Sequence, residues 1–231
     1  IQPMSYGSGT YQLATHYGKH LYLIVRLDST FSEEEANALQ DSMVIDAGSA
    51  EPFRAEPVDK ETFVAVENSL RQKLGELIAA HGANVNEGMF TSPTDDSRGL
   101  YTFDKYTVGA AVGWGGAQYK DNIYESSPDY PAKGCYEASF EDPGNGAFWS
   151  FTVYNRDGFM FDDVAHMSSN TASANPDGTY TIHFGCGADA LNNLPIENDT
   201  GVFNFVVRHY IPSERVRDDG YRLAPFIKKA E

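Results

Sequence analysis

Alternating apolar and polar residues predict β-strands through most of the C-terminal half of the chain. Residues 147–155 and 202–210 are rich in aromatic and β-branched side chains, which favour a pleated, half-buried surface. Residues 135–140 and 179–185 alternate in the same way. Asp-Gly pairs and other Gly-rich turns separate these runs, as between successive antiparallel strands. The pattern predicts a layered, antiparallel β-structure.

The same alternation assigns a core face and an outer face to the two longest strands. In the first strand it predicts a core face of Trp149, Phe151 and Val153. The outer face of that strand is predicted to carry Phe148, Ser150, Thr152 and Tyr154. In the last strand, the aromatic face is predicted to carry Phe203, Phe205, Val207 and His209, and the opposite face Asn204, Val206, Arg208 and Tyr210.

Helical spacing replaces the alternation in the N-terminal half. Residues 30–43 predict a helix capped by Ser32, with three glutamates in its first turn, where negative charge meets the positive end of the helix dipole. Residues 59–81 predict the clearest helix, with an apolar stripe of Phe63, Val66, Leu70, Leu74, Leu77 and Ile78. We expect this stripe to pack into the core. A short helix is predicted over residues 104–112.

The fold class that these elements predict is mainly β (α+β). We expect a jelly-roll-like antiparallel β-sandwich with two or three helices packed on it. Residues 1–50 are predicted to form an N-terminal β-hairpin (residues 9–27, flanked by His16 and His20) plus a helix. Residues 51–100 are predicted to hold a helix and a linker, and residues 101–231 the β-sandwich domain.

Charge excludes several classes of partner. The 231 residues carry a formal net charge of −16, which repels phosphate backbones and anionic lipid, so we expect no nucleic-acid or membrane partner. No apolar run reaches the length of a membrane span. The chain begins at Ile1 rather than Met, so we expect a leader or a larger N-terminal part to precede it.

The two cysteines, Cys135 and Cys186, both fall in strand-like segments. An exported protein could join them in a disulfide, but a free buried thiol is the commoner state of a strand cysteine, and we expect that state here. Their separation matches no zinc-site spacing. No cofactor is expected, because the glycine run over residues 113–116 lacks the strand-before, helix-after context of a phosphate-binding loop.

Several short motifs occur in a characteristic order in the second half. They are Ala147-Phe148-Trp149-Ser150, Asn175-Pro176-Asp177-Gly178-Thr179, Asn193-Leu194-Pro195, Arg208-His209-Tyr210-Ile211-Pro212 and Gly220-Tyr221. In this order they resemble the family known as domain of unknown function 1214, over about residues 100–228. The resemblance implies a jelly-roll-like fold that is often exported (secreted or periplasmic) and often oligomeric, with no settled reaction. Residues 9–45 resemble a reduced form of domain of unknown function 1254, which often precedes it.

Polar residues on the strands suggest one ligand site. If the strands are neighbours, Arg208, Tyr210, Tyr154 and His183 could line a polar concavity. Arginine can grip a carboxylate or phosphate with two hydrogen bonds, and His183 and Tyr154 are the candidate catalytic proton donors or acceptors. The alternative is a structural ion pair between Arg208 and Asp157 or a neighbouring residue.

Three hypotheses for function follow. The first is binding, and possible hydrolysis, of a small polar or anionic molecule that is sugar-like or phosphate-like. The second is a non-catalytic structural or assembly module that forms a homo-oligomer. The third is a metal-dependent enzyme using Asp162, Asp163 and His166, although a solvated acidic loop is the default interpretation of those residues.

Overall fold

The computed structural model describes residues 9–12, 23–25, 27, 31–48, 51–81, 85–91, 102–113 and 116–230. The chain divides into two compact units, Ile1–Lys60 and Glu61–Glu231. The predicted hairpin over residues 9–27, together with His16 and His20, lies mostly outside the described residues. Its described parts, residues 9–12, 23–25 and 27, contain no strand.

The first unit contains helix α1 (Glu33–Asp41), which begins where the sequence predicts. The Ser32 hydroxyl accepts a hydrogen bond from the Glu35 N–H, and the Glu35 carboxylate accepts one from the Ser32 N–H. This reciprocal capping box satisfies two N–H groups that a helix N-terminus leaves without partners. It confirms the predicted cap.

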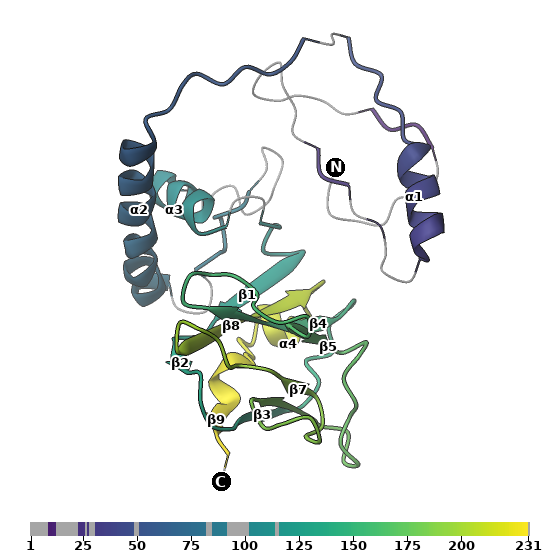
Figure 1. Cartoon of the computed structure of the whole chain (residues 1–231), viewed down its shortest axis with the longest axis vertical. Helices are drawn as coiled ribbons and strands as arrows, with labels where there is room; N and C mark the ends of the chain where they lie inside the picture. Colours follow the sequence, from purple (N-terminus) through teal and green to yellow (C-terminus); the bar gives the residue numbers. More distant parts are fainter. Residues whose placement is uncertain are drawn as a thin grey trace. The chain divides into compact units, whose positions relative to one another are not determined.

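Helices α2 (Lys60–His81) and α3 (Phe103–Gly113) lie where the periodicity predicts them, and both are visible in Figure 1. The prediction that the apolar stripe of α2 packs into the core is wrong, because no residue of α2 is buried. Phe63 is 57% exposed and Val66 is 53% exposed. The core is filled instead by residues of the strands, which leaves the stripe without a buried role.

Two sheets form the body of the second unit. Sheet A contains β1 (Asn122–Ser126), β2 (Tyr130–Pro131), β4 (Trp149–Asn155), β5 (His166–Ser168) and β8 (Val202–Tyr210). Its strand order is β1-β8-β4-β5, with β2 also paired to β8, and every pair is antiparallel. The long strand β8 is therefore the centre to which the shorter strands attach.

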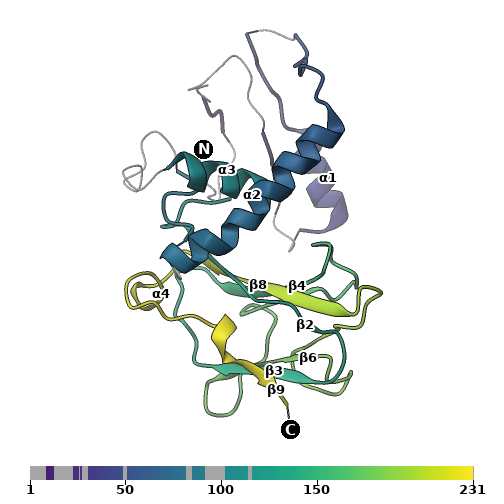
Figure 2. The same cartoon turned by 90° about the vertical axis from the view of Figure 1, so that its left-hand side faces the viewer.

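Sheet B contains β3 (Tyr136–Phe140), β6 (Tyr180–Phe184), β7 (Asn193–Leu194) and β9 (Ile227–Lys229). Its order is β7-β6-β3-β9, and among these described strands only the β6–β7 pair is parallel. Figure 2 shows the two sheets stacked as layers. The α+β class and the sandwich packing are confirmed.

The core between the sheets consists of the predicted aromatic faces. The Phe184 ring of sheet B lies 5.1 Å from Phe205 and 6.0 Å from Phe151 of sheet A, measured between ring centroids. Burying rings of this size contributes about 1.5–3 kcal/mol each to stability. The odd-numbered residues of β4 and β8 that were predicted to face the core are all fully buried or nearly so.

After β8 the chain forms the short helix α4 (Glu214–Arg217) and the 3₁₀ turn η3 (Ala224–Phe226), and then pairs as β9 with β3 at an edge of sheet B. The C-terminal segment thus runs from the end of a sheet A strand to an edge of sheet B. None of the described helices combines the length and the apolar character that a membrane span requires.

Candidate functional site

The outer face of sheet A carries a row of polar side chains that crosses four strands. Arg208 of β8 lies in register with Tyr124 of β1 on one side and with Ser150 of β4 on the other. Ser150 is in turn opposite Ser168 of β5. Residues directly opposite in an antiparallel pair project to the same side of the sheet. We call this surface the arginine face; its members are Tyr124, Ser150, Thr152, Tyr154, His166, Ser168, Arg208 and Tyr210.

The Arg208 guanidinium bonds to two neutral hydroxyl groups of β4. Its Nη1 donates to Thr152 Oγ1 and its Nη2 donates to Tyr154 OH, each at 2.9 Å. The alternative of an ion pair with Asp157 is wrong, since none of the ion pairs recorded within the described part of the chain includes Arg208. A partly buried arginine without a carboxylate partner retains donors for another acceptor.

Aromatic rings border the arginine on the same face. The Tyr210 ring stacks on Phe148 with centroids 4.2 Å apart. The Tyr124 hydroxyl accepts a hydrogen bond from the Ala117 N–H at 3.1 Å, and the Phe90 ring meets Tyr124 edge-on. Arg208 and Tyr154 are therefore in direct contact, and Tyr210 lies two residues farther along β8 with its ring stacked on Phe148.

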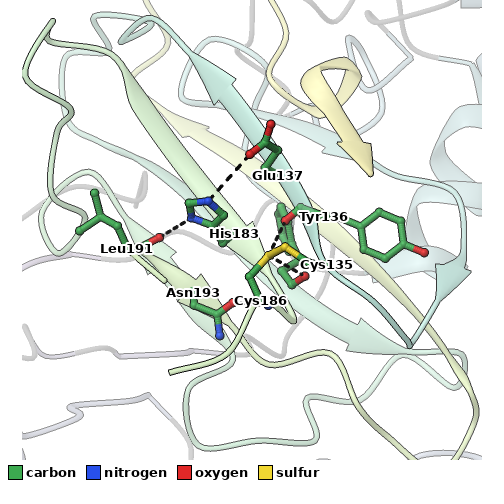
Figure 3. The surroundings of a disulfide bond; sticks show 8 residues. Cys135, Tyr136, Glu137, His183, Cys186, Leu191 and Asn193 are labelled. Carbon is green, nitrogen blue, oxygen red and sulfur yellow. Dashed lines mark hydrogen bonds and ion pairs between the residues drawn. A yellow bond between two sulfur atoms is a disulfide. The ribbon is translucent and has the colours of Figure 1, made fainter. Parts of the chain in front are cut away.

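His183 lies on the other sheet. It belongs to β6, and its neighbours Ile182 and Phe184 point into the core, so its imidazole projects from the outer face of sheet B. Its Nδ1 lies 2.6 Å from the Leu191 carbonyl oxygen and its Nε2 lies 3.9 Å from Glu137 Oε2, as Figure 3 shows. The sandwich core separates it from Arg208, which corrects the predicted grouping.

A different histidine lies on the arginine face. His166 of β5 is in register with Thr152 of β4, whose hydroxyl accepts a hydrogen bond from Arg208. The sequence placed His166 in a polar loop, because three residues are too few to show strand periodicity. Only the pairing with β4 identifies this imidazole as a neighbour of the arginine.

The metal-site hypothesis finds no ligand cluster. Asp162 Oδ1 accepts a hydrogen bond from the Val164 N–H at 2.8 Å, which is ordinary turn chemistry. His166 is on strand β5 and not in that turn. Among the residues that the structure describes, no group of three or more histidine, cysteine or acidic side chains is arranged to hold a metal ion.

Cys135 and Cys186 form a disulfide, which corrects the expectation of free thiols. The bond joins the start of β3 to the residues just after β6, as Figure 3 shows. The Cys186 N–H also donates to Asn193 Oδ1 at 2.9 Å. Covalent and hydrogen bonds therefore tie three strands of sheet B together at this end.

A buried polar chain that the sequence analysis did not identify lies under the arginine face. The Glu125 carboxylate lies 2.5 Å from His209 Nε2, and His209 is fully buried. His209 Nδ1 faces the Asn145 amide nitrogen at 3.1 Å. Because an amide nitrogen can only donate, the ring proton lies on Nε2 and points to Glu125. Such a buried group holds structure together and cannot meet a ligand directly.

These observations define the class of the protein: an α+β chain whose β-sandwich presents an arginine and hydroxyl groups on one outer face. Residues 125–214 match the family described as "Protein of unknown function (DUF1214)", which confirms the predicted resemblance over that segment. The match begins within β1 and ends at the start of α4. The additional resemblance at residues 9–45 lies outside the matched segment.

Two solved structures are similar to the chain. The crystal structure of the VPA0106 protein from Vibrio parahaemolyticus is 24% identical, with a TM-score of 0.52, over 78% of this chain and 48% of that one. An uncharacterized protein from Burkholderia cenocepacia is 18% identical, with a TM-score of 0.38, over 69% of this chain and 41% of that one. The chain thus spans about half the length of these proteins or less. The first likeness supports the fold alone. No curated protein matches the chain.

Proposed function

We propose that the arginine face binds a small anionic molecule, with a carboxylate or phosphate group held by Arg208. The observation that carries this proposal is the bonding of Arg208, whose recorded partners are the neutral oxygens of Thr152 and Tyr154. The chain has 33 acidic and 17 basic residues, so carboxylates are plentiful, yet none pairs with this arginine within the described residues. Partly buried charges are ordinarily paired, and a ligand anion would supply the missing partner.

The neighbouring side chains suit a polar anion such as a sugar acid or a sugar phosphate. Two of the five guanidinium N–H donors are used, which leaves others to form a fork with two oxygens. Ser150 and Ser168 lie in the same row but are buried, at 7% and 8% exposed, and the Tyr210–Phe148 stack lies on the same face. These groups match a ligand that carries hydroxyls as well as negative charge.

Hydrolysis is the finer form of the proposal. Among the titratable groups of the arginine face, we propose the Tyr154 phenol and the His166 imidazole as the groups that donate or accept protons. His183 has no part in it, because it lies on the opposite sheet. Turnover of phosphate esters and glycosides by wild type, lost in His166→Ala, would support this form.

Thermal-shift binding to a panel of sugar acids, sugar phosphates and dicarboxylates tests the proposal. We expect one class to stabilise the wild type and Arg208→Ala to weaken that binding about 10- to 100-fold, as the loss of a charge-assisted contact predicts. Arg208→Lys keeps the positive charge but loses the forked pair of N–H donors, so its affinity should lie between those of wild type and Arg208→Ala. Arg215→Ala is the matched control, because Arg215 pairs with Glu141 at the surface. Equal affinity of wild type and Arg208→Ala would contradict the proposal.

We also propose that the protein acts in an oxidising compartment, outside the cell or in the periplasm. The disulfide between Cys135 and Cys186 supports this, because such bonds persist in exported proteins and are rare in a reducing cytosol.

A second candidate function, assembly of a homo-oligomer, is favoured by α2. This helix of 22 residues buries none of its side chains. Large exposed apolar groups along one helix are typical of surfaces that another chain covers. A second copy of the chain is the partner that we propose.

A further inference from the structure

A backbone turn just before β1 holds three buried oxygens that lack hydrogen-bond partners within the described residues. They are Gln118 Oε1, Asp121 Oδ2 and Asn122 Oδ1. Gln118 is 8% exposed and Asn122 is 4% exposed. Native proteins leave few buried polar atoms unpaired, and a group of them calls for a bound water, ion or ligand.

The three residues belong to one short segment that backbone hydrogen bonds close into a turn. The N–H groups of Asp121 and Asn122 both donate to the Gln118 carbonyl, at 2.8 and 2.9 Å. These two bonds close a turn over residues 118–122, and Asn122 is also the first residue of β1. The Ile211 N–H donates to the Asp121 carbonyl at 2.9 Å, which ties the turn to the end of β8.

Residues 85–91 lie over the segment that leads into this turn. The Phe90 ring occupies the space beside Gly116, where a Cβ would come within 2.5 Å of it. The Phe90 ring therefore covers part of the segment that leads into the turn.

Asn86 also has unpaired amide atoms, Oδ1 and Nδ2, and it is 5% exposed. We do not count it as a ligand of the site, because the Lys105 ammonium donates to the adjacent Glu87 carbonyl at 2.8 Å. The positive charge of Lys105 therefore lies against the residue that follows Asn86 and would repel a cation bound there.

We propose that the Gln118–Asp121–Asn122 turn binds a hard divalent cation of the calcium type. All three unpaired atoms are oxygens, two from amide carbonyls and one from a carboxylate, which are ligands that Ca²⁺ takes in proteins. The carboxylate contributes the only formal charge among them. Asp121 is half-buried as a residue, and its Oδ2 atom is buried. With a single carboxylate, the affinity should resemble that of weak extracellular sites, roughly 0.1–1 mM. This proposal does not involve Arg208, although Asn122 lies in register with Tyr210 of the arginine face.

Titration of chelator-treated protein with CaCl₂ in about 150 mM salt, where long-range surface electrostatics are screened, tests the site. We expect a saturable rise in melting temperature and one bound ion per chain by calorimetry. Asp121→Asn should weaken binding at least 10-fold. Asn122→Asp adds a second carboxylate next to the first and should tighten it about 10-fold, as affinity follows the charge of the ligand set. Asp163→Asn, an exposed loop aspartate, is the matched control for non-specific binding to an acidic chain.

Three outcomes would overturn the proposal. If no titration of wild type or Asn122→Asp changes the melting temperature or releases heat, the oxygens are hydrated by water alone. If Asp121→Asn binds as tightly as wild type, calcium binds elsewhere. If Asp163→Asn weakens binding as much as Asp121→Asn, the effect comes from net charge.

Discussion

The Glu125 carboxylate connects the two sheets through hydrogen bonds. It accepts hydrogen bonds from the backbone N–H groups of Leu223 and Ala224, at 2.8–3.0 Å, and from His209 Nε2. Leu223 is fully buried, and the chain beyond it becomes η3 and β9. A single carboxylate of sheet A therefore holds the start of the segment that pairs with sheet B. Alternation showed that residue 209 faces inward but could not show that its partner comes from β1.

We expect Glu125→Gln to destabilise the protein by about 2–4 kcal/mol. The amide NH₂ of glutamine would face the N–H groups of Leu223, Ala224 and His209, which are themselves donors. Urea unfolding monitored by Trp149 fluorescence measures this loss. Hydrogen exchange should also quicken at the amides of Leu223 and Ala224. Glu137→Gln, a half-buried carboxylate on the outer face of sheet B, is the control and should cost less than about 1 kcal/mol. Equal losses for the two variants would show that Glu125 has no special role.

At the scale of elements, length decided which strands the sequence predicted. β3, β4, β6 and β8 have five or more residues and alternate clearly. β5, β7 and β9 have two or three residues, and the sequence pattern does not predict them as strands. All three lie at sheet edges, where pairing with a longer neighbour defines the strand more than its own propensity does. Because β5 carries His166, this omission also hid part of the candidate site.

Removing the disulfide with Cys135→Ala and Cys186→Ala together should lower the free energy of unfolding by about 2–4 kcal/mol. The physical reason is that the bond closes a long loop, with a sequence separation of 51 residues, and so restricts the unfolded chain. The urea midpoint of the double variant, compared with oxidised wild type, measures it. Reduced wild type should match the double variant. Identical midpoints for oxidised and reduced wild type would contradict the prediction.

At the scale of the whole molecule, the β-sandwich buries its own apolar side chains, whereas helix α2 does not. The sandwich fills its own core with the rings of both sheets. Helix α2 has the periodicity of a core helix but none of the burial. The net charge of −16 favours solubility and disfavours close packing of copies, so any contact between copies would need an apolar surface such as this one.

We expect wild-type protein to form an oligomer and the double variant Phe63→Asp, Val66→Asp to be a monomer, because charge on the α2 stripe would have to be buried on association. Light scattering coupled to size-exclusion chromatography measures the mass. Phe159→Asp is the matched control, since Phe159 is 69% exposed in the β4–β5 connection. A monomeric wild type at every concentration would exclude this mode of assembly.

Local patterns were enough to predict which residues form the core and where the main helices lie. Trp149, Phe151 and Phe205 had to face inward in any sheet, because side chains alternate at every step of a strand and apolar rings avoid water. The capping of α1 is equally local, since its donors and acceptors are three residues apart.

Only the tertiary structure determined which residues far apart in the sequence are in contact. It put His166 opposite Thr152 and His183 on the other sheet, and it joined Cys135 to Cys186. It also left Arg208 with hydroxyl partners and left no residue of α2 buried. The reason is that periodicity specifies the side of a strand or helix on which a residue lies, while the neighbour across that side depends on the order and register in which the chain folds.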